Sequence, residues 1–254
     1  MDEAIVRGVK LRVWKNAPRT MREAFLAGRA HGDATYLVFE DERASFENFS
    51  RAAVKLAHEF IAEGVQKGDR VVVALRNLPE WPVAYFAALL VGAIATPLNA
   101  WGTGNELEYG LVDSGAKVAV LDGERWSRLE SRLDACRDLK RVFLTRTAVT
   151  PGMHPAVRSL QDVIGPTNRW GDLPVLPLPE VPLEPDDDAT LFYTSGTTGP
   201  PTGALGTPRP GTTVLMANNF VGLRNFVRRG EAPPDPAART TQRLKSVEAS
   251  ARSG

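Results

Sequence analysis

The chain has 254 residues, of which 43% are hydrophobic and 24% charged, and its formal net charge is +1. This length suits one large domain or two smaller ones, each with a hydrophobic core. The nearly neutral balance argues against a surface that recruits nucleic acid or anionic lipid, and the single cysteine, Cys136, excludes an intrachain disulfide framework.

The N-terminal segment lacks a secretory signal, because it begins with acidic residues and contains no uninterrupted apolar run. The uncharged stretch 83–98 is shorter than the roughly 20 residues of a membrane span, and Gly92 and Pro97 interrupt it. We therefore predict a buried helix over 80–91 and a strand over 93–97. These features predict a cytoplasmic protein without a transmembrane segment.

The first two-thirds of the chain alternate between strand-like and helix-like segments. A hairpin is predicted around Asp41 and Glu42, and Ser45 is expected to cap a helix whose apolar residues recur at helical spacing up to Gly64. The β-branched run 70–75 is typical of a strand that is buried on both faces.

The alternation continues beyond the buried helix. Thr103 and Glu106 have the spacing of a capping box, and Gly115 is a natural helix end. The next segments predict a strand over 117–122, an amphipathic helix over 123–139 and a strand over 140–145. Alternating strands and helices imply a largely parallel sheet covered by helices, so the predicted fold class is α/β.

After Thr150 the sequence becomes rich in proline, and residues 173–188 are predicted to be an extended connector. Residues 189–195 are predicted to form a short strand that runs directly into a loop rich in Gly, Ser and Thr. Pro210 and Gly211 are expected to delay the next helix to about Thr212. This helix is predicted to be amphipathic through the apolar residues Leu215, Phe220, Leu223 and Val227.

The loop YTSGTTGPPTGALGT, residues 193–207, is a candidate anion site. Its glycines permit close backbone approach, and its hydroxyl groups can donate hydrogen bonds to phosphate oxygens. A strand followed by such a turn lets backbone N–H groups converge on an anion, although a plain surface linker is the alternative. The spacing excludes a Walker loop, a G-x-G-x-x-G dinucleotide fingerprint and a G-x-S-x-G nucleophile elbow.

Residues 193–203 resemble the phosphate-binding signature of the AMP-forming adenylating enzymes, which include acyl-CoA synthetases, luciferases and peptide-synthetase adenylation domains. The pattern is Tyr/Phe-Thr-Ser-Gly-Ser/Thr-Thr-Gly-x-Pro-Lys-Gly, and this chain departs from it only at Thr202, which stands in place of the lysine. Residues 68–122 are similar to the block that precedes the loop in the same family. The likeness covers most of residues 20–210.

The resemblance implies a site and a reaction. The β- and γ-phosphates of ATP would be bound by Thr194, Ser195, Gly196, Thr197, Thr198, Gly199 and Gly203. A carboxylic acid and ATP, accompanied by magnesium, would give an acyl-adenylate, and a thiol, usually that of coenzyme A, would then displace AMP. The residues after the prolines, GALGT, resemble those of acyl-CoA synthetases more than those of peptide-synthetase domains, and by family resemblance the expected acid is a fatty acid. No catalytic residue, metal ligand or oligomeric state follows from the sequence.

The family's enzymes are much longer than this chain. We therefore expect a truncated form, with a partial adenylating domain over 1–210, an aberrant helix and disordered tail over 211–254, no C-terminal domain, and exposed apolar faces. Two functions stay open: an acyl-adenylating ligase, and a non-catalytic nucleotide-binding or interaction module. Four tryptophans are predicted to pack rather than stack on a substrate, namely Trp81, Trp101, Trp126 and Trp170.

Overall fold

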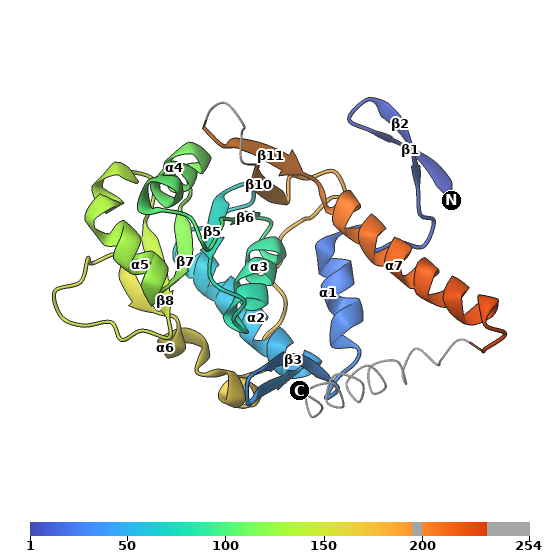
Figure 1. Cartoon of the computed structure of the whole chain (residues 1–254), viewed down its shortest axis with the longest axis horizontal. Helices are drawn as coiled ribbons and strands as arrows, with labels where there is room; N and C mark the ends of the chain where they lie inside the picture. The colour runs from blue at the N-terminus through green and yellow to red at the C-terminus, as the bar shows by residue number, and fades with distance from the viewer. Residues whose placement is uncertain (195–199, 233–254) are drawn as a thin grey trace.

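The centre of the molecule is a seven-stranded sheet in the order β11-β10-β6-β5-β7-β8-β9 (Figure 1). The structure, a computed structural model, describes residues 1–194 and 200–232. Its strands are β5 (Arg70–Ala74), β6 (Ile94–Pro97), β7 (Val118–Asp122), β8 (Arg141–Thr145), β9 (Val157–Ser159), β10 (Thr190–Thr194) and β11 (Thr202–Gly206). Neighbouring strands are parallel except for the antiparallel hairpin β10–β11. The predicted parallel α/β sheet is confirmed.

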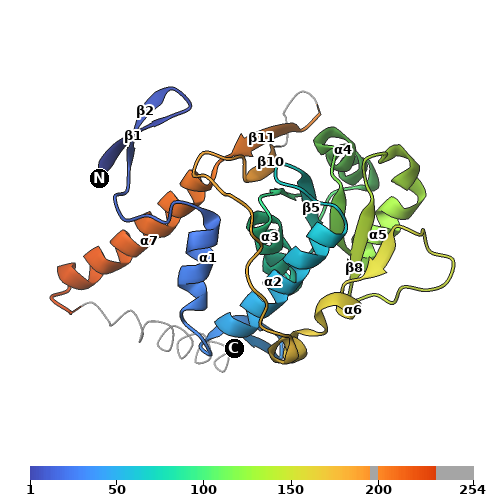
Figure 2. The same ribbon diagram turned by 180° about the vertical axis from the view of Figure 1, so that it is seen from behind.

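Helices cover both faces of this sheet (Figures 1 and 2). One face carries α1 (Met21–Arg29), α2 (Phe46–Ala62), α3 (Glu80–Leu90), α6 (Gln161–Ile164) and the 3₁₀ helix η2 (Thr167–Asp172). The other face carries α4 (Gly104–Ser114), α5 (Gly123–Leu129) and the 3₁₀ helix η1 (Glu130–Ala135). Alternate residues of β5 enter the two cores, Val71 and Val73 on one side and Val72 and Ala74 on the other. The β-branched run is therefore buried on both faces, as the sequence predicts.

Local capping chemistry fixes the helix ends that position the candidate site. The Ser45 hydroxyl accepts a hydrogen bond of 3.1 Å from the backbone N–H of Asn48 at the start of α2. Thr103 and Glu106 form a reciprocal capping box at the start of α4, and Gly115 ends that helix in the left-handed conformation with φ of 58°. Only glycine adopts this conformation without strain, so the predicted caps are confirmed.

Two helix predictions need correction. The helix expected over 123–139 is shorter, because α5 ends at Leu129 and η1 at Ala135, an arrangement that keeps Leu129 and Leu133 buried against the sheet. Helix α7 (Pro208–Arg228) begins before Thr212. The first-turn N–H groups of a helix have no intrahelical acceptor, so Pro208 and Pro210 forfeit no hydrogen bond there.

The remaining elements are two small hairpins outside the central sheet, β1 (Asp2–Val6) with β2 (Val9–Val13), and β3 (Thr35–Phe39) with β4 (Glu42–Ser45). The second is the hairpin predicted around Asp41. The β1–β2 hairpin and α7 lie at the same end of the molecule in both ribbon views (Figures 1 and 2). The rings of Trp14 and Phe220 meet there at 5.9 Å.

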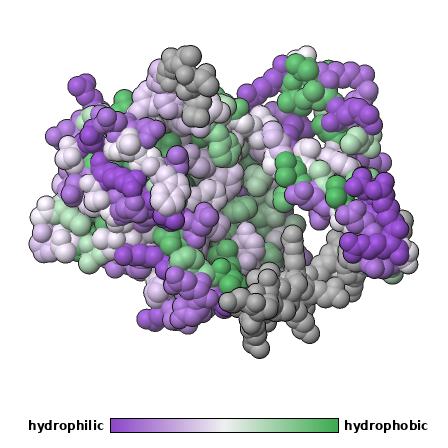
Figure 3. Space-filling model, viewed as in Figure 1, coloured by the Kyte–Doolittle hydropathy of each residue, from purple (hydrophilic) through white to green (hydrophobic). Residues whose placement is uncertain are grey.

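Apolar side chains are exposed at this end of the molecule, and Figure 3 shows some of them over the β1–β2 hairpin. Ile5 is 75% exposed, and Leu215 and Phe220 of α7 are about half exposed. Leu215, Phe220 and Leu223, the described members of the apolar set predicted for α7, are all exposed, in agreement with the expected exposure of apolar faces. Val227 lies where side chains are not described, and residues 233–254, which make up most of the tail predicted from Gly230 onward, lie outside the described residues. Over the described ranges, no helix is long and apolar enough to cross a membrane.

Candidate functional site

The candidate site lies at the carboxyl ends of the parallel strands, the edge at which ligands bind in open α/β sheets. Strand β10 reaches this edge at Thr194, and β11 leaves it at Thr202. The five predicted phosphate-binding residues between them lie outside the described residues, namely Ser195, Gly196, Thr197, Thr198 and Gly199. The described part of the site therefore consists of the two arms of the hairpin and the elements that pack against them.

The hairpin brings together the two predicted site residues that the structure describes. Thr194 pairs with Thr202 and Tyr193 with Gly203, and the Thr194 hydroxyl donates to the Thr202 carbonyl at 3.3 Å. A Cβ on Gly203 would lie 2.9 Å from Cδ1 of Leu191 and 3.4 Å from Cε1 of Tyr193. Glycine at 203 thus leaves room for side chains of the neighbouring strand. The exposed side chain of Thr202 occupies the position where the family signature has lysine.

Helix α4 contacts both arms of the hairpin. The Tyr193 hydroxyl donates to Oδ2 of Asp113 at 2.7 Å, and the Tyr109 hydroxyl donates to the Pro201 carbonyl at 3.0 Å. The two tyrosine rings meet edge to face at 6.2 Å. Burial, together with the hydrogen bond to Asp113 and its negative charge, raises the pKa of Tyr193 well above its usual range, so the phenol stays protonated as a donor.

A cavity of about 320 Å³ lies between α4, the loop after β6 and the hairpin. Its lining combines apolar residues and glycines with polar side chains: Tyr193 and Pro201 come from the hairpin, Glu106, Leu107, Tyr109 and Gly110 from α4, and Leu98, Asn99 and Gly102 from the loop after β6. Its volume falls in the range of small-molecule sites. The tyrosine hydroxyls that line it are already committed to Asp113 and Pro201.

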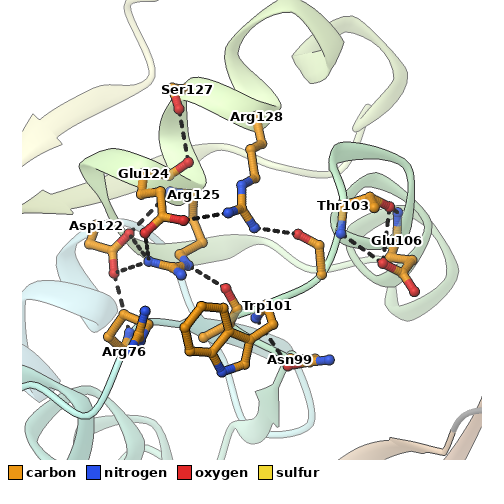
Figure 4. A network of polar contacts seen from close by, with 12 residues as sticks. Arg76, Asn99, Trp101, Thr103, Glu106, Asp122, Glu124, Arg125, Ser127 and Arg128 are labelled. Atoms are coloured by element: carbon orange, nitrogen blue, oxygen red, sulfur yellow. Dashed lines mark hydrogen bonds and ion pairs between the residues drawn. The ribbon is translucent and has the colours of Figure 1, made fainter.

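A polar network surrounds the carboxyl ends of β5 and β7 (Figure 4). The Asp122 carboxylate accepts two hydrogen bonds, of 3.0 and 2.9 Å, from Nη1 of the buried Arg125 and one of 3.2 Å from the backbone N–H of Arg76. Nε of Arg125 donates to the Ala100 carbonyl at 2.7 Å. The ion pair therefore ties the loops after β5, β6 and β7 to one another.

The same edge carries an exposed aromatic ring and a cation. The guanidinium of Arg76 lies 3.8 Å from the ring centre of Trp101, whose side chain is 67% exposed. Packing was the predicted role of all four tryptophans. It is correct for the buried Trp126 and Trp170, and Trp81 stacks on Tyr85, but it is wrong for the exposed Trp101, whose ring lies beside Arg76 (Figure 4). An indole beside a guanidinium offers stacking and positive charge together.

The described residues contain no cluster of three or more His, Cys, Asp or Glu side chains that could hold a metal ion. A magnesium ion at this edge would need ligands of another kind, such as phosphate oxygens of a bound nucleotide, which is a usual arrangement for this cation.

Comparison with known proteins assigns the family. A family model described as AMP-binding enzyme matches residues 25–221, which is most of the chain and includes the hairpin. The chain belongs to this AMP-binding enzyme family. The resemblance inferred from the loop and from residues 68–122 is thereby confirmed.

Curated relatives of this AMP-binding chain include CoA ligases. It is 34% identical over 156 residues to 4-coumarate–CoA ligase 2 of Oryza sativa subsp. japonica, covering 58% of the chain and 26% of that protein. It is 30% identical over 181 residues to the crotonobetaine/carnitine–CoA ligase of Citrobacter koseri, covering 69% and 34%. The chain thus spans between about a quarter and a third of the length of these relatives.

Solved structures share the fold of the AMP-binding chain. A long-chain-fatty-acid–CoA ligase, FadD1 from Archaeoglobus fulgidus, superposes with a TM-score of 0.64 at 25% identity and covers 87% of this chain and 42% of its own. The anthranilate CoA ligase AuaEII gives a TM-score of 0.65 at 23% identity, covering 78% and 36%. The fold therefore matches an N-terminal portion of adenylate-forming enzymes.

Sequence reasoning missed Tyr109, Asp113 and Arg76 as members of this edge. Tyr109 and Asp113 are four residues apart and so share one face of α4, which is a signal readable in the sequence. Their contacts with the hairpin span 92 and 80 residues, respectively, and had no sequence signal.

Proposed function

We propose that this chain serves the ATP-dependent activation of a carboxylic acid to an acyl-adenylate, followed by transfer of the acyl group to coenzyme A. The observation that carries the proposal is the β10–β11 hairpin, which holds the signature at the carboxyl edge of a parallel sheet. The family match and the CoA ligases among the relatives support it. The proposed compartment is the cytoplasm.

The proposed phosphate cradle comprises the seven predicted residues: Thr194, Ser195, Gly196, Thr197, Thr198, Gly199 and Gly203. Attack of a carboxylate on the α-phosphate of ATP releases pyrophosphate, so negative charge accumulates on the departing phosphates. Backbone N–H and hydroxyl donors that already point at these oxygens stabilise that charge more than the ground state, which lowers the barrier. Thr194, at the end of β10, is the first of these donors along the chain.

The narrower proposal for the acid is a fatty acid. Its support is the long-chain-fatty-acid–CoA ligase among the structural neighbours. Other relatives carry the names of coumarate, crotonobetaine or carnitine, and anthranilate ligases, so the broader class is a small carboxylic acid.

The proposal is tested by two measurements on the same preparation. Calorimetry with magnesium-ATP and with AMP measures binding, and exchange of labelled pyrophosphate into ATP, with and without a panel of carboxylic acids, measures adenylation. We expect the wild-type chain to bind ATP and to exchange pyrophosphate only when a suitable acid is present. Thr194→Ala should weaken both ATP binding and exchange. Thr213→Ala, a change at an exposed position on α7, should leave both unchanged. Binding without exchange would favour the non-catalytic nucleotide-binding module, and no binding of either nucleotide would refute both the ligase and the nucleotide-binding module.

A further inference from the structure

The hairpin that carries the signature is weakly attached to the rest of the sheet. Within the described chain, β10 has a single paired position with β6, Thr190 with Ala95, at the start of the strand. Strand β11 pairs with β10 and forms the edge of the sheet. At Thr194 and Thr202, the end of the hairpin next to the turn, the hairpin therefore has no paired position with β6. Contacts with another element are needed to hold this end in place.

Helix α4 supplies that support at both arms. Asp113 accepts a hydrogen bond of 2.7 Å from the Tyr193 hydroxyl, one residue before Thr194. The Tyr109 hydroxyl reaches the Pro201 carbonyl at 3.0 Å, one residue before Thr202. The two contacts thus lie on opposite sides of the turn, one within β10 and one at the residue just before β11.

The helix is itself firmly fixed. Its first turn is closed by the capping box of Thr103 and Glu106, and its last turn ends at the left-handed Gly115. Leu107 and Leu111 are buried in the core on the α4 side of the sheet. A helix that is fixed at both ends and buried along one face restrains the residues that hydrogen-bond to it.

We propose that Tyr109 and Asp113 are positioning residues that hold the described arms of the β10–β11 hairpin against α4 and thereby fix the positions of Thr194 and Gly203, the two described residues of the proposed nucleotide site. The role as a nucleotide site rests on the proposed function. A hydrogen bond to a carboxylate is stronger than one between neutral groups, so the Asp113 contact is expected to contribute more than the Tyr109 contact. The two side chains act through Tyr193 and Pro201 and do not themselves touch the phosphates.

The first test needs no nucleotide. Amide hydrogen exchange is measured by NMR in the wild-type chain, in Asp113→Asn and in Tyr109→Phe, with Asp134→Asn and Tyr85→Phe as matched controls away from the hairpin. We expect exchange at the β11 amides that donate to β10 to rise about tenfold in the first two variants, which corresponds to the loss of one modest hydrogen bond. Exchange in β5 and β7 should stay unchanged. Unchanged exchange in β11, or an equal rise throughout the sheet, would overturn the proposal.

The second test separates positioning from general stability. Calorimetry with magnesium-ATP, pyrophosphate and AMP should show about tenfold weaker binding of ATP and pyrophosphate in Asp113→Asn, with AMP affinity retained. Equal loss for all three ligands, or no loss, would contradict the positioning role. If the wild-type chain bound no ATP, the proposed function would fail by itself, and hydrogen exchange would still decide whether Tyr109 and Asp113 hold the hairpin.

Discussion

Replacing Thr202 by lysine is expected to strengthen ATP binding. Thr202 is exposed and lies directly across the hairpin from Thr194, the first residue of the proposed cradle. A lysine ammonium at this position would extend from the strand toward phosphate oxygens and form a charge-assisted hydrogen bond. Such a bond contributes about 1.5–3 kcal/mol, so the dissociation constant for ATP should fall about 10-fold to 100-fold.

The assay is calorimetry of Thr202→Lys with magnesium-ATP, pyrophosphate and adenosine at two salt concentrations. The gain should appear for ATP and pyrophosphate, shrink as salt rises, and be absent for adenosine, because the added charge acts on phosphate. Thr202→Gln is the matched control, since it lengthens the side chain without adding charge. A gain that glutamine reproduces, or that adenosine shares, would refute the reasoning.

The remaining predictions concern stability. The hydrogen bond from Arg29 holds the pKa of Glu47 below its usual range, so the pair stabilises the fold at neutral pH, and this contribution is lost as pH falls through the lowered pKa. Glu47→Gln should therefore lower the free energy of unfolding by about 1 kcal/mol at pH 7. In urea unfolding, the variant should lose less of its stability than the wild type does when the pH is lowered from 7 to 3. Gly104→Ala should lower stability by about 1–3 kcal/mol in thermal unfolding, because the new methyl would lie 2.5 Å from the carbonyl oxygen of Arg128. Gly222→Ala, with nothing within 4 Å, should instead stabilise α7 by up to about 1 kcal/mol, and equal effects of the two alanines would contradict the steric account.

The central sheet could be predicted from the sequence because its signals are local. The run at β5 is apolar at successive positions, and Ser45, Thr103 and Gly115 mark helix ends through contacts within a few residues. Strand β11 was not predicted, because its sequence TGALG contains two glycines and no β-branched residue after Thr202. It forms a strand through pairing with β10, which is a tertiary effect.

The candidate site could be predicted only in part for a similar reason. The sequence placed Thr194 near the end of a strand, which the structure confirms, whereas Gly203, predicted to lie in the loop, belongs to β11. The support from α4 depends on Tyr109 and Asp113 meeting residues 80 or more positions later in the chain. The Arg76–Trp101 contact likewise joins the loops after β5 and β6, which become neighbours only in the folded sheet.

The proposed binding of ATP phosphates by the backbone and hydroxyl groups of residues 194–199 is tested most directly by amide NMR of the wild-type chain titrated with magnesium-ATP and, separately, with adenosine. Binding through the phosphates predicts saturable shifts of the amides in 194–199 and at Gly203 with ATP, reproduced by pyrophosphate and absent with adenosine. Unshifted amides in this segment at saturating ATP, or shifts confined to other parts of the chain, would contradict it.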